Sequence, residues 1–105
     1  SIPSPDDFQG RAKLAGILAW RGDYACSYEL YVDSAFRTGD PMVLVSAGEV
    51  AVRAGQAGRA AEFLAAAEQT VLVPAHKERI ALAYLAARGM VSMPQGGGKG
   101  SDLAD

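Results

Sequence analysis

Three glycines divide the chain into segments of nearly equal length. Gly22, Gly55 and Gly89 lie 33 and 34 residues apart, and each follows a segment whose apolar residues recur every three or four positions. Glycine at the end of a helix readily adopts the left-handed backbone conformation that closes it. Because helix-ending glycines that recur at this period are typical of stacked helical hairpins, the sequence predicts an all-α fold built from repeats.

Prolines, capping residues and glycines predict where the helices begin and end. The first helix is expected to start at Ser4 and Pro5, with a capping hydroxyl ahead of a proline at the first helical position. Gly39 is expected to end the second helix, and the pair Asp40–Pro41 repeats the start signal for the third. These signals predict five helices, over about residues 5–21, 24–38, 41–54, 60–71 and 74–88.

The length of 105 residues suits one domain, which we expect to cover residues 1–89. Residues 90–105 contain Pro94, the glycine run 96–98 and few apolar side chains. Ordering such a segment costs more conformational entropy than its burial returns. We therefore expect residues 90–105 to form a flexible tail or linker.

The composition narrows the class of protein. Ten Lys and Arg against twelve Asp and Glu give a net charge of -2 without a basic cluster, which disfavours nucleic-acid binding. Cys26 is the single cysteine, so no internal disulfide is expected and a cytoplasmic location is the default. No apolar stretch approaches the ~20 residues of a membrane span. The abundance of Ala and the absence of Asn are what we expect of a bacterial or bacteriophage protein.

The residues around the predicted turns resemble a known family. The segment 20–24, Trp-Arg-Gly-Asp-Tyr, resembles the turn between the two helices of a tetratricopeptide repeat, and Leu14-Ala15 resembles the Leu-Gly pair that precedes it. In the second unit five residues fall at the family's spacing: Gly48, Gly55, Ala60, Leu64 and Ala67. The resemblance covers residues 6–89 and implies two stacked antiparallel helical hairpins plus a fifth, capping helix. The chain departs from the consensus at Ser27, and an unrelated bundle of α-hairpins is the alternative fold.

A protein similar to this family is expected to bind other proteins and to lack a catalytic centre. The resemblance implies a concave groove, lined by the first helix of each hairpin, that accepts a helix or an extended segment of a partner. The groove residues it implies are Gln9, Ala12, Gly16, Trp20, Val45, Glu49, Val52, Arg53 and Arg79. No cofactor, metal, nucleic acid or membrane is expected to take part, and either homo- or hetero-oligomers are possible.

A structural role is the alternative function. In that hypothesis the stack is a subunit of a larger complex or virion and contacts its neighbours through its convex and end faces and through the tail. An enzyme is disfavoured, because one histidine and scattered carboxylates provide no convergent acid, base or nucleophile.

Several side chains have both a functional and a purely structural interpretation. Trp20 is either an interface anchor or a tryptophan half-buried against the next hairpin. Cys26 is expected to fill space in a buried or half-buried position, and His76 to lie at the surface. The spacing of Glu49 and Arg53 is that of an ordinary ion pair within one helix.

Overall fold

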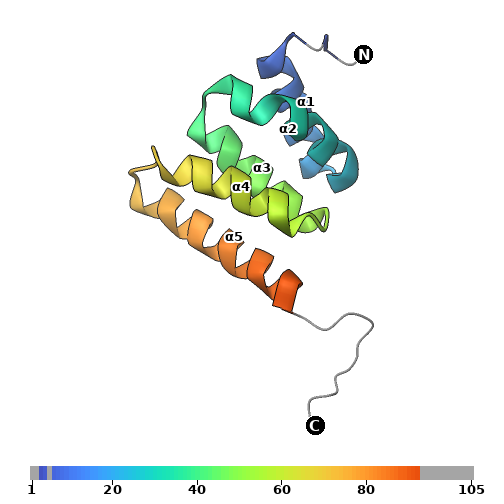
Figure 1. Cartoon of the computed structure of the whole chain (residues 1–105). Coiled ribbons are helices and arrows are strands. Elements are labelled where there is room, and N and C mark those ends of the chain that lie inside the picture. Colours follow the sequence, from blue (N-terminus) through green and yellow to red (C-terminus); the bar gives the residue numbers. More distant parts are fainter. Residues whose placement is uncertain (1–2, 5, 93–105) are drawn as a thin grey trace.

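The computed structural model describes residues 3–4 and 6–92, and it is helical with no strand among those residues (Figure 1). The predicted all-α class is therefore confirmed. The five helices are α1 (Phe8–Trp20), α2 (Tyr24–Thr38), α3 (Pro41–Arg53), α4 (Ala57–Glu68) and α5 (Pro74–Ser92). Within residues 3–4 and 6–92, none of these helices combines the length and apolar character needed to cross a membrane.

Aspartates begin the first three helices. The carboxylates of Asp7, Asp23 and Asp40 each accept a hydrogen bond from a backbone N–H in the first turn of the helix. The prediction that Ser4 caps the first helix is wrong, because Asp7 binds the N–H of Gly10 and α1 starts three residues later than Pro5. The predicted start of α3 is confirmed, with Asp40 as the cap and Pro41 in the first turn.

Two of the three evenly spaced glycines close a helix, and the third does not. Gly22 and Gly55 have φ values of 87° and 79°, in the left-handed region that other residues avoid, and each lies in a turn. Gly89 was expected to stop the fifth helix, but it lies inside α5, which continues to Ser92. Residues 90–92 therefore belong to the helix, while residues 93–105 of the expected tail lie outside the described residues.

The helices succeed one another across the molecule, from α1 and α2 at one end to α5 at the other (Figure 1). The most extensive contacts join α1 with α2 and α3 with α4. In addition, α1 contacts α3, and α3 contacts α5. The principal dimensions are 51 × 33 × 19 Å, and the smallest is about two helix diameters of ~10 Å. The helices therefore pack as the pairs α1–α2 and α3–α4, with α5 against α4 and α3.

Small residues let the helices approach closely. An ideal Cβ at Gly48 in α3 would lie 2.7 Å from Cγ and Cδ2 of Leu64 in α4, closer than van der Waals contact allows. Between α1 and α2, the buried hydroxyl of Ser27 donates to the carbonyl oxygen of Ala15 at 2.7 Å. The core is built mostly from Ala, Val and Leu, and Phe63 is its largest fully buried side chain.

The outer face of α5 differs from that of a capping helix. A cap presents a polar face to water, because nothing packs beyond it. Here Leu82 and Leu85 are 59% and 57% exposed, and Ala81 and Ala86 beside them are also exposed. A capping helix was expected to have a polar outer face, and the exposed face of α5 is apolar instead.

Candidate functional site

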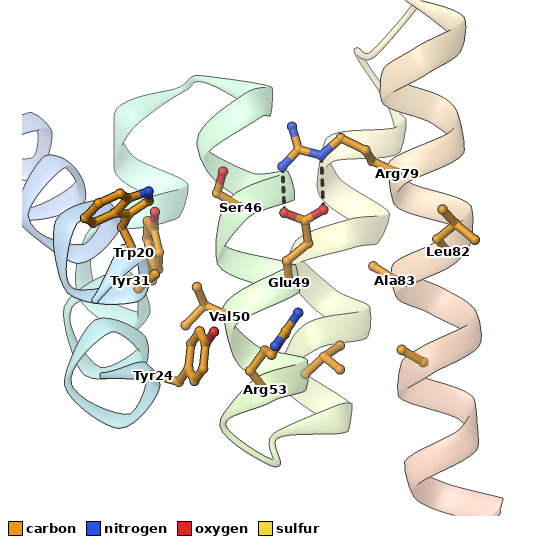
Figure 2. Close-up of a pocket in the computed structure, with 14 residues that line it drawn as sticks. Trp20, Tyr24, Tyr31, Ser46, Glu49, Val50, Arg53, Arg79, Leu82 and Ala83 are labelled. Carbon is orange, nitrogen blue, oxygen red and sulfur yellow. Dashed lines mark hydrogen bonds and ion pairs between the residues drawn. The ribbon is translucent and has the colours of Figure 1, made fainter. Parts of the chain in front are cut away.

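A groove of about 550 Å³ lies between α1, α3 and α5, with α2 contributing to one wall (Figure 2). It is open along one side and is lined largely by apolar surface. Figure 2 shows side chains from α1 and α2 on one wall, α3 along the middle and α5 on the other wall. The lining residues are Gly16, Ala19, Trp20, Tyr24, Tyr31, Ser46, Glu49, Val50, Val52, Arg53, Arg79, Leu82, Ala83 and Ala86.

Trp20 stands at the rim of the groove. It is the last residue of α1 and is 90% exposed, so its indole has almost no contact with the rest of the chain. This exposure rules out a tryptophan half-buried against the next hairpin. Exposing an indole forgoes the burial of a large apolar surface, roughly 150–250 Å² for an aromatic side chain. Such residues are enriched among those that carry binding energy at protein interfaces.

An ion pair links the middle of the groove to its far wall. Arg79 of α5 donates from Nε to Oε2 of Glu49 at 3.0 Å and from Nη2 to Oε1 at 2.6 Å. This two-pronged geometry matches the planar guanidinium to the carboxylate and is stronger than a single hydrogen bond. The pairing raises the pKa of Arg79, so the guanidinium stays charged. The spacing of Glu49 and Arg53 predicted an ion pair within α3. Glu49 instead pairs with Arg79 of α5.

Arg53 is the second guanidinium in the groove. Its Cζ lies 5.4 Å from the centroid of the Tyr24 ring, within the range of a cation–π contact, and the residue is exposed. The two arginines and one glutamate give the groove a net charge of +1, although the chain as a whole carries -2. The groove is therefore a locally cationic, largely apolar surface.

Tyr31 forms part of the floor. Its ring is buried, and its hydroxyl lies 3.7 Å from where a Cβ at Gly16 would stand. Burial, and to a smaller degree the charge of Glu49, raise the pKa of the phenol above its ordinary value. The absence of a side chain at Gly16 leaves the hydroxyl open to the groove.

The structure brings together six of the nine residues that the family resemblance implied for the groove: Gly16, Trp20, Glu49, Val52, Arg53 and Arg79. Gln9 and Ala12 line a separate, smaller hollow with Val43. Gln9 also donates from Nε2 to the carbonyl oxygen of Thr38 at 3.3 Å. Val45 is fully buried because α3 has neighbours on several sides, so it cannot touch a partner.

The sequence interpretation missed several parts of the lining. Tyr24 and Tyr31 belong to α2, whereas only the first helix of each hairpin was expected in the groove. Leu82 comes from α5, where nearly continuous apolar residues concealed which face is free. The cation–π partner of Arg53 could have been found only by knowing that α2 and α3 lie side by side.

The other reactive side chains lie outside the groove. Cys26 is exposed, which corrects the expectation of a buried filler, and hydrogen bonding to Asp23 and the nearby charge raise the pKa of its thiol. A raised thiol pKa lowers the thiolate fraction and thus its reactivity. In the part of the chain that the structure describes, no three His, Cys, Asp or Glu side chains are grouped closely enough to hold a metal ion.

In comparisons with known proteins, no family model, curated protein or solved structure matches this chain. The residues of the groove are therefore the basis for assigning a function.

Proposed function

We propose that this chain is a non-catalytic protein-interaction module of the tetratricopeptide type, with an adaptor or chaperone-like role. It binds a helix or an extended segment of a partner protein in the groove between α1, α3 and α5. The observation that carries this proposal is the exposure of Trp20, 90% accessible at the rim of an apolar groove. A large aromatic side chain left in water beside an apolar hollow is a typical anchor for a binding partner.

The stacking order supports the repeat type. Contacts join α1 to α3 and α3 to α5, as expected when the first helices of successive hairpins form one layer. The turns at Gly22 and Gly55 recur at the repeat period. This layer is the one that carries the groove.

The chemistry of the groove describes the partner. Its floor and the α5 wall offer Ala83, Ala86 and Leu82, which suit the apolar face of an amphipathic helix. Because Glu49 already neutralises Arg79, Arg53 is the cation left to receive a partner charge. The preferred segment therefore has an apolar stripe and an acidic residue beside it.

The direct test is capture of partners from an extract of the source cells by the tagged full chain, with identification by mass spectrometry. Combining Trp20→Ala with Arg53→Glu removes the anchor and reverses the charge. We expect the captured partners to fall about tenfold or more, since loss of a hot spot costs roughly 2 kcal/mol or more. Circular dichroism should stay helical, because both side chains are exposed.

The matched control is Leu72→Ala, which removes an 81% exposed apolar side chain outside the groove. This variant should capture the same partners as the original chain. With a purified partner, the fluorescence of Trp20, the single tryptophan, should shift to shorter wavelength on binding as the indole leaves water. Undiminished capture by the double variant would refute the groove as the binding site.

An assembly subunit is the second candidate function. The observation that favours it is the exposed apolar face of α5, which a freestanding stack does not need. Under this alternative the end of the stack makes the principal contacts. Loss of capture in the groove variant, with assembly unaffected, distinguishes the two candidates.

A further inference from the structure

One buried hydroxyl of the groove lacks a hydrogen-bond partner. Tyr31 of α2 is only 4% exposed, and its phenol makes no hydrogen bond to any residue that the structure describes. The two buried serines are both satisfied, since Ser27 donates to the carbonyl oxygen of Ala15 and Ser34 to that of Leu30, each at 2.7 Å. Buried polar groups are normally paired, because an unpaired one has lost its water without gaining a partner. Tyr31 is therefore the exception among the buried hydroxyls.

The hydroxyl of Tyr31 can be reached from the groove. Tyr31 belongs to the lining, and an ideal Cβ at Gly16 would stand 3.7 Å from the hydroxyl oxygen. Within residues 3–4 and 6–92, Nε of Arg11 is the one side-chain nitrogen or oxygen that is both sealed from solvent and without a partner. The hydroxyl of Tyr31 is therefore not sealed, and the missing side chain at Gly16 leaves a gap through which a partner side chain can reach it.

Two further polar side chains line the groove from α3. Ser46 has no hydrogen-bond partner in the described part of the chain. Both carboxylate oxygens of Glu49 accept from Arg79, and each retains a lone pair for a further donor. Figure 2 shows Ser46 and Glu49 on α3, across from Tyr31. The hollow between them offers a phenol on one side and oxygen acceptors on the other.

The charges around this hollow favour a neutral polar group. Burial, and next the negative charge of Glu49, raise the pKa of Tyr31, so a second anion is disfavoured beside the hydroxyl. A cation would meet the guanidinium of Arg79, which already neutralises Glu49. An apolar side chain would take water from the hydroxyls of Tyr31 and Ser46 without giving them partners. A neutral side chain that both donates and accepts hydrogen bonds satisfies all of these conditions.

We propose that Tyr31 and Ser46 select a partner segment that places one carboxamide side chain, glutamine or asparagine, in its otherwise apolar face. The carboxamide oxygen accepts from the hydroxyl of Tyr31, and the NH₂ group donates to an oxygen of Ser46 or Glu49. The carboxamide carries both functions on one planar group, and it extends further from the backbone than the hydroxyl of a serine or threonine. The inference rests on the proposed function, because it names a residue of the segment that the groove binds.

Peptide selection against the purified full chain tests the chemistry of the partner. The probe is a phage-displayed library of amphipathic helices whose apolar face is randomised. We expect the enriched peptides to share one glutamine or asparagine within a face of leucine and alanine, because a site built for hydrogen bonds rejects side chains that cannot make them. Weaker binding to Trp20→Ala identifies the peptides that occupy the groove.

Removal of one oxygen atom tests the role of Tyr31. Tyr31→Phe keeps the ring and should weaken the carboxamide peptide about threefold to tenfold, the usual worth of one neutral hydrogen bond. The same peptide with methionine in place of the carboxamide residue should bind Tyr31→Phe at least as well as the original chain. Tyr84→Phe, which removes a hydroxyl outside the groove, is the matched control and should bind both peptides normally. Fluorescence anisotropy of labelled peptides measures these affinities.

Closing the gap above the hydroxyl is a separate test. The added methyl of Gly16→Ala would lie at ordinary contact distance from Tyr31, so the fold tolerates it, yet it covers the hydroxyl. We expect the carboxamide peptide to bind this variant about threefold to tenfold more weakly. Gly58→Ala, where a Cβ meets nothing within 4 Å, is the matched control and should bind the peptide normally. Circular dichroism on each variant checks that the helices persist.

The outcomes separate this inference from the proposed function. A selection that yields no peptide sensitive to Trp20→Ala would refute the groove and the carboxamide together. Groove-binding peptides with only apolar, charged or hydroxyl side chains on the bound face would overturn the carboxamide alone. Unchanged binding of the carboxamide peptide to Tyr31→Phe would do the same, while the groove would stand as the binding site.

Discussion

Gly48 shows how a single residue sets the distance between two helices. It is buried where α3 meets α4, and the side chain of Leu64 occupies the space that a Cβ would take. The carbonyl oxygen of Ala60 is a further neighbour, 3.5 Å from that ideal Cβ. Backbone on one side and a buried leucine on the other leave little freedom to adjust.

We predict that Gly48→Ala destabilises the protein by about 1–3 kcal/mol, the usual cost of overpacking a core, despite the better helix propensity of alanine. The matched control is Gly58→Ala in α4, where a Cβ meets nothing within 4 Å. That change should be neutral or stabilise by up to about 1 kcal/mol. Urea unfolding followed by circular dichroism measures both, and equal effects would show that the α3–α4 contact is not close at Gly48.

At the scale of the element, the same residue type plays opposite roles at equivalent positions. Gly55 has a positive φ and closes the turn after α3, whereas Gly89 continues α5 for another three residues. The physical difference lies in the packing of the next segment of chain. The chain must reverse after Gly55 so that α4 can pack on α3, but no described helix packs back on α5 after Gly89.

This difference predicts substitutions of opposite sign. Gly55→Ala should destabilise the protein by about 1–2 kcal/mol, because alanine resists the left-handed conformation. Gly89→Ala should stabilise α5 by about 0.5–1 kcal/mol, since a Cβ there meets nothing within 4 Å and alanine favours a helix. Thermal unfolding of the two variants measures the signs. Destabilisation by Gly89→Ala would mean that this glycine ends a helix after all.

At the scale of the whole molecule, Tyr31 depends on three helices at once. It belongs to α2, faces Gly16 of α1, and responds to the charge of Glu49 on α3. Burial and Glu49 raise its pKa above the ordinary 10.0. The phenol therefore keeps its proton in the folded protein at a pH where the unfolded chain has begun to lose it.

The sign of the resulting pH dependence is set by this shift. Below pH 10.0, the pKa of the phenol in the unfolded chain, the stabilisation that comes from the protonated form of Tyr31 is complete. This stabilisation is lost as the pH rises through the pKa of Tyr31 in the folded protein. We predict that the free energy of unfolding falls as the pH rises past 10.0, the pKa of the phenol in the unfolded chain. Tyr31→Phe should show a smaller fall, with a remainder from Tyr84, whose pKa is also raised by burial. An identical pH profile in both proteins would contradict a shifted Tyr31.

Much of the fold was predictable because its signals are local. An aspartate beside the first turn, a proline in it, or a glycine after the last turn acts on backbone within a few residues. Asp40–Pro41 and Gly55 could therefore be interpreted without knowing what packs against them. The prediction that Ser4 caps the first helix was wrong because the carboxylate of Asp7, three residues later, accepts a hydrogen bond from an N–H group of the first turn.

The candidate site was predictable only where the repeat register carried it. Gly16, Glu49 and Arg79 were expected on one surface and do line one groove. The repeat register did not predict that Val45 is enclosed by neighbouring helices. It also did not predict that α2 contributes two tyrosines to the groove. Those facts depend on which helix faces are left uncovered.

The sequence by itself determined that the chain is helical, that turns follow at Gly22, Gly39 and Gly55, and that the helices approach closely, because caps, glycines and alanines act on their immediate neighbours. Only the tertiary structure decided that Glu49 takes Arg79, 30 residues away, over Arg53 in the next turn. It also decided that Trp20 stays in water while Val45 does not. The reason is physical: burial and pairing are properties of surfaces that meet, and those surfaces come from segments far apart in the chain.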